Sequence, residues 1–317
     1  MTDHDAAAAF ATQRPSLAMR LASAILGRRG RRNEGKPANL TADRRLVDRV
    51  TSLSRVPRGV KVTKGEIAGV PVLRASSGAS DRGTVLFLHG GAYVVGSARD
   101  VVGVAHVCAN GGPDVVSVEY RLAPEHPYPA AVEDALAVYR ELVCAVGADR
   151  LVVTGESAGG GLALVLLQKA RDEGLAMPAA VVPVFPWADL SLSGESSTAN
   201  IGRDMLTRTQ VLEYAARYAG GRDLRAPGLS PLFGTFRGFP RTYIPVGQYD
   251  LVLDDARRVA ARMHAEDVDI VLDEWPGTIH GFLSVPSTEA RQCRKRIRRF
   301  VHEALPAVTT LIGQENP

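Results

Sequence analysis

One segment of the chain has the residue types and spacing of a nucleophilic serine. GESAG at 155–159 fits the pattern G-x-S-x-G, and Ser157 lies between an apolar run at 151–154 and a glycine-rich helix start at 159–161. A strand that turns sharply into a helix exposes the serine hydroxyl, and flanking glycines let neighbouring backbone come close. The sequence therefore predicts that Ser157 is a nucleophile; the alternative is a structural tight turn.

A second glycine-rich turn can supply the hydrogen-bond donors that an acyl-transfer reaction needs. HGGA at 89–92 overlaps the end of the apolar run TVLFLHG at 84–90 and follows directly from it. Backbone N–H groups stabilise the negative charge that develops on a carbonyl oxygen under attack. We expect the N–H groups of Gly90, Gly91 and Ala158, the residue after the serine, to form an oxyanion hole. Alone, the turn would be an ordinary glycine-rich strand exit.

The general base is expected after the serine in the chain, with the acid between them. Three histidines, His264, His280 and His302, follow Ser157. His264 and His302 lie in helical patterns, whereas His280 follows the last apolar run, at 269–276. A loop at the end of a strand can carry an imidazole over the serine, so His280 is the predicted base.

The carboxylate that orients this histidine is expected at the end of another strand. Asp250 follows the apolar run at 241–247. Asp254 and Asp255 begin the next helix, where acidic residues commonly complement free N–H groups. Asp250 is therefore the predicted partner of the histidine, holding its tautomer and stabilising the imidazolium.

Short apolar runs alternate with helical patterns of 12 to 18 residues from about residue 60 onward. Such runs are typical of strands buried on both faces of a mainly parallel sheet covered by helices. The predicted strands, about eight, are 60–67 and 69–75 as an antiparallel pair, then 84–90, 114–120, 150–157, 179–186, 241–247 and 269–276. The pattern predicts one α/β core at 59–186 and 221–317, an N-terminal helical arm at 1–58 and a cap insertion at 187–220.

The positive charge of the 317-residue chain belongs to its N-terminal arm. Residues 1–64 contain 14 Lys and Arg against 5 Asp and Glu, whereas the other 253 residues contain 24 basic and 29 acidic residues. The arm includes a helical pattern with Leu17, Leu21, Ala24 and Ile25 on one face, followed by arginines. A packing arm or lid is the preferred interpretation of this helix, and a membrane-surface helix is the alternative. No basic stretch carries the interleaved aromatic residues of single-strand nucleic-acid binders, so no nucleic-acid partner is expected.

Cysteine usage and hydropathy predict a cytoplasmic protein. The three cysteines are far apart and match neither a disulfide framework nor a zinc site. The early apolar stretch precedes its arginines, which is the reverse of a signal peptide, and no run is long enough to form a transmembrane segment.

A set of motifs resembles the hormone-sensitive-lipase family, the bacterial family IV esterases. The resemblance extends from about residue 60 to 305. It is carried by HGGAYVVGS (89–97), YRLAPEHPYPAAVEDA (120–135), GESAGGG (155–161), FPWADLSLSG (185–194), SPL (230–232), VGQYDLVLDDA (246–256) and WPGTIHGF (275–282).

The resemblance implies an α/β-hydrolase fold with a helical cap. It also implies a serine carboxylesterase that acts on short- to medium-chain acyl esters through a Ser157–His280–Asp250 triad and an acyl-enzyme. No cofactor or metal is expected; the partner is a small-molecule ester, and a homodimer is compatible with the family. The family commonly reads H-G-G-G, and here Ala92 replaces the third glycine; because the expected donors precede it, the hole should form.

Further roles are expected around the motifs. Tyr93, Trp187 and Phe282 are bulky neighbours of the motifs and are expected to bind substrate. His89 resembles a structural histidine beneath the oxyanion loop, and Glu156 is expected to brace a neighbouring loop. Two alternatives stay open: a deacetylase, lactonase or acyl-transfer enzyme for a specialised metabolite with the same triad, and a non-catalytic ligand-binding homologue.

Overall fold

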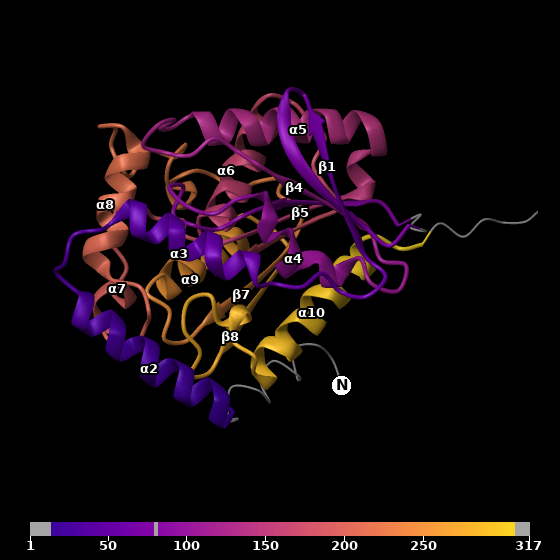
Figure 1. The fold of residues 1–317 in the computed structure, drawn as a ribbon. Helices are drawn as coiled ribbons and strands as arrows, with labels where there is room; N and C mark the ends of the chain where they lie inside the picture. Colours follow the sequence, from indigo (N-terminus) through magenta and orange to yellow (C-terminus); the bar gives the residue numbers. More distant parts are fainter. Residues whose placement is uncertain (1–13, 79–81, 308–317) are drawn as a thin grey trace, which may run out of the picture.

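The computed structural model describes residues 14–78 and 82–307, in which eight strands form a single sheet (Figure 1). The strands are β1 (Lys61–Ile67), β2 (Val70–Ser76), β3 (Thr84–Leu88), β4 (Asp114–Val118), β5 (Leu151–Glu156), β6 (Ala180–Val184), β7 (Arg241–Gly247) and β8 (Ile270–Trp275). Their order is β1-β2-β4-β3-β5-β6-β7-β8. β2 runs antiparallel to both of its neighbours, and the other pairs are parallel.

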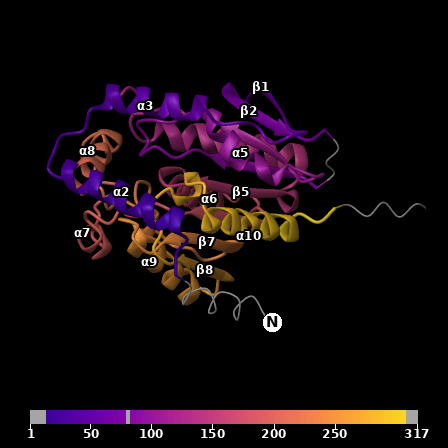
Figure 2. The same cartoon turned by 60° about the horizontal axis from the view of Figure 1, so that its bottom comes forward.

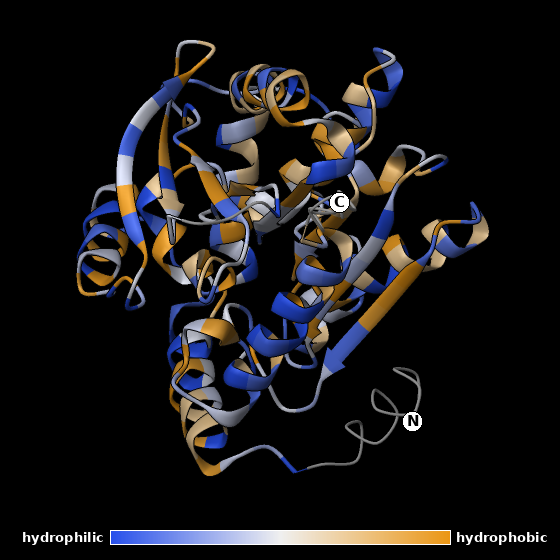
Figure 3. Cartoon of the chain, turned by 90° about the vertical axis from the view of Figure 1, so that its right-hand side faces the viewer, coloured by the Kyte–Doolittle hydropathy of each residue, from blue (hydrophilic) through white to orange (hydrophobic). Residues whose placement is uncertain are grey.

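The predicted mostly parallel sheet with helices on both faces is confirmed. β3 and β6 are buried at every residue, as expected of strands covered on both sides. In Figure 1, α4 (Val101–Val104) and α10 (Thr288–Ala304) lie in front of the sheet. The other face is covered by α5 (Ala130–Val146), which runs along the top of Figure 1, α6 (Ala158–Asp172) and α9 (Leu253–Ala265). Orange and blue segments alternate along the helices in Figure 3, the pattern of helices with one face toward a core.

Four further helices cover the edge at which the parallel strands end. They are α2 (Leu17–Asn33), α3 (Leu40–Ser52), α7 (Ser196–Ala199) and α8 (Arg208–Ala219). Figures 1 and 2 both show α2, α7 and α8 together at one side of the molecule. The N-terminal segment is tied to α8: the Glu34 carboxylate accepts hydrogen bonds from the Arg208 and Thr209 N–H groups at 2.9 and 3.1 Å, and Tyr214 bonds to Asp43.

Helix α2 packs on the molecule through small residues, and its predicted apolar face with Leu17, Leu21 and Ile25 is exposed. Its buried residues are Met19, Ser23, Gly27 and Gly30. A Cβ atom on Gly30 would lie 2.3 Å from the Asp204 carbonyl oxygen, so the helix and segment 202–205 touch backbone to backbone. The close contact requires glycine, which turns the aliphatic side chains of α2 toward solvent. Within the described residues, no helix is both long and apolar enough to cross a bilayer.

Candidate active site

Ser157 lies at a tight turn between β5 and α6. Its backbone has φ 56° and ψ −119°, a region that residues with a side chain rarely adopt. Its N–H donates to the Val184 carbonyl at 3.0 Å, and its carbonyl accepts from the Gly161 and Trp187 N–H groups at 3.0 Å each. The surrounding backbone therefore holds a strained conformation that raises the hydroxyl above the sheet edge.

The glycines two residues to either side of Ser157 let the turn approach β3. A Cβ atom on Gly155 would lie 2.8 Å from the Leu88 carbonyl oxygen, and one on Gly159 would lie 2.0 Å from the same atom. Real Cβ atoms do not come so close to backbone oxygen, so a side chain at either position would push the turn away from β3. The prediction that glycines flank the serine to admit neighbouring backbone agrees with these distances.

Three loops bring the predicted nucleophile, base and acid into one line of hydrogen bonds. Nε2 of His280 lies 2.8 Å from Oγ of Ser157, and Nδ1 of His280 lies 3.0 and 2.9 Å from the two carboxylate oxygens of Asp250. Asp250 has no exposed surface and His280 is almost fully buried. With Nδ1 donating to Asp250, Nε2 is free to accept the serine proton.

The surroundings of His280 favour its charged form. Burial by itself lowers the pKa of the imidazole, but the charge and hydrogen bond of the Asp250 carboxylate, together with other nearby acidic groups, raise it above the ordinary 6.5. Charges on Asp204 and Glu156 act in the same direction. A proton accepted from the serine is therefore stabilised on this ring.

The three expected oxyanion donors lie around the serine. Ala158 is the first residue of α6, so its N–H has no acceptor within the helix. A Cβ atom on Gly90 would be 3.5 Å from Cβ of Ser157, which places this turn directly against that serine. Gly91 has φ 115°, and both Gly90 and Gly91 line the same cavity as Ser157.

His89 lies under the glycine turn. It has no exposed surface, stacks on Tyr120 with ring centroids 4.1 Å apart, and has Nδ1 2.8 Å from the Gly90 carbonyl oxygen. Burial lowers its pKa to about 4, so the ring is neutral and donates from Nδ1. This position is compatible with the structural role expected for His89, and the ring does not line the cavity.

A cavity of about 480 Å³ opens above Ser157. The sheet edge forms its floor, with Ser157 and His280. The N-terminal helices and α8 supply much of its wall. Its apolar lining residues include Leu26, Leu46, Val47, Val95, Phe185, Trp187, Leu206, Val211 and Val252. The volume and lining are typical of a site for a small, mainly apolar molecule.

Of the three residues expected to bind substrate, only Trp187 lines this cavity. Tyr93 is buried against Tyr218, with stacked rings 3.8 Å apart. Phe282 is fully buried, and its ring lies 5.9 Å from that of Trp275. Tyr93 and Phe282 therefore support the cavity from behind, because their large apolar rings are taken up by the core. Proximity to a motif in sequence did not reveal the direction of these side chains.

Glu156 lies on the cavity wall. Burial and the nearby charge of Asp100 raise its pKa to about 7. Asp100 lines the same cavity and accepts a hydrogen bond from the Thr51 hydroxyl at 2.8 Å. Glu156 therefore borders the space expected to hold substrate, and its role as a loop brace stays a prediction.

Asp204, in the insertion, is a buried carboxylate that sequence reasoning missed. One oxygen accepts the N–H of Met205 at 2.6 Å and of His280 at 3.0 Å, and the other accepts the N–H of Leu251 at 2.7 Å. Burial and the charge of Asp250 raise its pKa to about 7. Asp204 thus joins the loop that carries His280 to the loop that carries Asp250. Its partners are backbone groups distant in sequence, so no local motif identifies it.

Asp254 and Asp255 lie in the first turn of α9, as expected, and their carboxylates also fasten the insertion to this helix. The Asp255 carboxylate accepts the N–H groups of Ala188 and Asp189 at 2.9 and 2.8 Å. Asp254 accepts the N–H of Ser196 at 2.8 Å. The residues next to the Asp250 loop therefore also fix the start of the insertion.

Replacement of Asp204 by Asn should destabilise the protein. An amide group keeps one acceptor oxygen but turns an NH₂ group toward an N–H donor, leaving a buried donor unsatisfied. We expect the free energy of unfolding, measured in urea at pH 8, to fall by about 1–3 kcal/mol. Asp269→Asn, at an exposed position, serves as the matched control and should change stability little. Equal stability of both variants would show that the Asp204 contacts contribute little.

Comparisons with known proteins agree with this architecture. A family model described as the α/β-hydrolase fold matches residues 85–284. An acetyl-hydrolase from Streptomyces hygroscopicus is 39% identical over 230 residues, covering 71% of this chain and 75% of that protein. The putative acetyl-hydrolase LipR from Mycobacterium tuberculosis is 35% identical over 240 residues, 75% of this chain and 78% of that protein.

Solved structures of similar fold also belong to esterases and lipases of this kind. A hormone-sensitive lipase from a metagenome library is 31% identical, with a TM-score of 0.86 over 92% of this chain and 100% of that one. An esterase from the bacterial hormone-sensitive-lipase family is 33% identical, with a TM-score of 0.85 over the same shares. The chain therefore belongs to the α/β-hydrolase family, within its hormone-sensitive-lipase branch, as its motifs predicted.

Proposed function

We propose that the protein hydrolyses short- to medium-chain acyl esters, with Ser157 as nucleophile, His280 as general base and Asp250 as the carboxylate that orients the base. Ester hydrolysis itself follows from the family, because its related members are esterases and acetyl-hydrolases. The observation that carries the residue assignment is the continuous line of hydrogen bonds from Asp250 through His280 to Ser157, on the floor of an apolar cavity.

The reaction proceeds in two half-reactions. His280 takes the proton from Ser157 as the serine oxygen attacks the ester carbonyl, and the N–H groups of Gly90, Gly91 and Ala158 stabilise the oxyanion. The same proton then passes from His280 to the departing alcohol, leaving an acyl-serine. Water, deprotonated by His280, attacks the acyl-serine, and His280 returns that proton to Oγ of Ser157 as the acid leaves, which restores the free serine.

Asp204 is a positioning residue in this scheme. It touches neither the serine nor the space above it, but it fixes the backbone on both sides of the His280–Asp250 contact. Its negative charge also favours protonated His280. Its removal should therefore affect both the geometry and the proton affinity of the base.

Replacement of Ser157 by Ala should lower kcat/KM for p-nitrophenyl acetate by about 10³-fold or more, because the nucleophile is lost while the fold is kept. The native enzyme should also be labelled by a serine-directed fluorophosphonate, and the variant should not. Ser193→Ala, at a serine outside the cavity, is the matched control and should be labelled normally. Failure of the native protein to react would favour the non-catalytic ligand-binding alternative.

The loss of activity at low pH should reflect protonation of His280. The imidazole must be neutral to accept the serine proton, so kcat/KM should fall as the pH drops, with a midpoint above 6.5 because Asp250 raises the pKa of the ring. The Asp204→Asn and Glu156→Gln variants each remove a negative charge that favours protonated His280 and should move the midpoint to lower pH. A flat profile between about pH 5 and 8 would contradict the assignment of His280 as base.

Acyl chains of two to six carbons should be preferred over long ones. The cavity of about 480 Å³ is closed by α2, α3 and α8, which limits the length of chain that fits. Two relatives are named acetyl-hydrolases and another an ethyl acetate hydrolase, which supports a short acyl group. The measurement is kcat/KM for p-nitrophenyl esters of increasing length; a maximum at twelve carbons or more would refute the preference. The same series on acetylated amides and lactones separates the deacetylase and lactonase alternatives.

A further inference from the structure

Helix α2 presents a ridge of large aliphatic side chains to solvent. Leu17, Leu21 and Ile25 are 68%, 54% and 64% exposed and follow one another at intervals of four residues. Residues at this spacing lie along one face of a helix. Burial of each such side chain typically stabilises a folded protein by about 1.5–3 kcal/mol. The isolated chain does not gain this stabilisation from these three residues. These three residues are called the α2 ridge below.

The ridge continues into a basic end of the same helix. Arg28, Arg29, Arg31 and Arg32 follow the ridge and are all exposed. Residues 14–58 contain 12 Lys and Arg against three acidic residues. Two of these acids already have partners: Glu34 accepts hydrogen bonds from residues of α8, and Asp43 accepts one from Tyr214. The outer side of α2 therefore carries a strong positive potential beside its apolar ridge.

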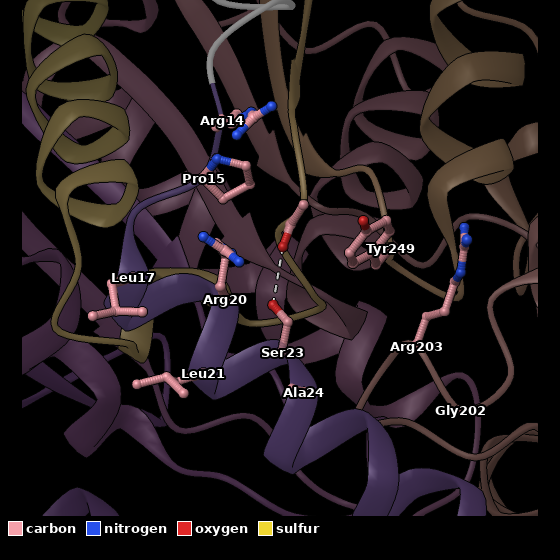
Figure 4. A pocket seen from close by; sticks show the side chains of 11 residues that line it. Arg14, Pro15, Leu17, Arg20, Leu21, Ser23, Ala24, Gly202, Arg203 and Tyr249 are labelled. Atoms are coloured by element: carbon pink, nitrogen blue, oxygen red, sulfur yellow. Dashed lines mark hydrogen bonds between the residues drawn. The ribbon is translucent and has the colours of Figure 1, made fainter.

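A second cavity flanks the ridge on the side away from Ser157. Its volume is about 710 Å³, and three arginines, Arg14, Arg20 and Arg203, line it with Leu17 and Leu21 (Figure 4). The Ser23 hydroxyl donates a hydrogen bond of 2.9 Å to the Gly277 carbonyl, which fastens the helix behind this cavity. In Figure 4 this bond is the dashed line that starts at Ser23. Guanidinium groups beside aliphatic side chains suit a ligand with a phosphate attached to hydrocarbon.

The active-site cavity borders the opposite flank of the same helix. Leu26 and Arg29 of α2 line the cavity above Ser157, and Leu46 of α3 both lines it and is 45% exposed. The ridge thus separates a basic cavity from the catalytic one. A surface that receives the ridge would lie next to the catalytic cavity.

We propose that α2 docks the protein on an anionic lipid surface, with the α2 ridge inserted among the acyl chains and the arginines bound to lipid phosphates. An apolar ridge beside a basic surface is the pattern of helices that lie in the plane of a membrane interface. A second copy of the chain fits less well, because its equally basic helix would bring like charges together. Docking would place the cavity above Ser157 beside the lipid, where apolar esters concentrate.

The proposal is tested by co-sedimentation of the full chain with phosphatidylcholine vesicles, with and without phosphatidylglycerol. Binding is expected to the anionic vesicles and should weaken with added salt. The Leu17→Ser/Leu21→Ser/Ile25→Ser variant should bind about tenfold more weakly or worse. The Arg28→Gln/Arg32→Gln variant should bind anionic vesicles about tenfold more weakly, and its binding should depend less on salt, because two of the basic residues near the lipid are lost. Val271→Ser, an exposed apolar position on β8, is the control and should bind as the native protein does.

Activity on soluble p-nitrophenyl acetate and the melting temperature should stay unchanged in the ridge variant, because its three residues lie outside the cavity above Ser157. Absence of binding by the native chain to anionic vesicles, or equal binding by the ridge variant, would overturn the proposal. So would a native dimer, seen by light scattering, that the ridge variant converts to monomer, since the ridge would then be an interface between copies.

Discussion

The close approach of the β5–α6 turn to the end of β3 is the contact on which the site depends. Gly155 and Gly159 leave no room for a side chain against the Leu88 carbonyl, and Ser157 between them is held at positive φ. The same approach brings the glycine turn after β3 against the serine. Backbone contacts between two adjacent parallel strands thus place Ser157 and the expected oxyanion donors together, before any side chain contributes.

His280 and Asp250 come from the other half of the sheet, and the insertion holds their loops. Asp204 accepts N–H groups from both the His280 and the Asp250 loops, while Asp254 and Asp255 accept N–H groups from the start of the insertion. Buried carboxylates that each satisfy several N–H donors fix backbone geometry firmly. The insertion, which helps to shape the cavity, therefore also positions the loops of His280 and Asp250, so a change in the insertion also affects the contact between these two residues.

Helix α2 completes this arrangement through its small residues. Gly30 lies against the Asp204 carbonyl, and Ser23 donates to the carbonyl of Gly277, three residues before His280. The N-terminal arm thus supports, from outside, both the segment of Asp204 and the loop of His280. Because the small residues of α2 face the core, its aliphatic residues face solvent. The same helix therefore packs on the molecule through one side and exposes an apolar ridge on the other.

The sequence by itself determined the parallel sheet, the serine turn, the glycine turn and the choice of His280 and Asp250. These features depend on local patterns: apolar runs, glycine spacing, and residues placed just after strands whose ends must meet at one edge. Only the tertiary structure decided the direction of Tyr93 and Phe282, the role of Asp204 and the outward face of α2. Side-chain direction in irregular segments and the pairing of a carboxylate with distant backbone N–H groups depend on contacts between residues far apart in the chain. The leucine spacing of α2 identified its apolar face, but two glycines on the opposite face decided which side approached the core.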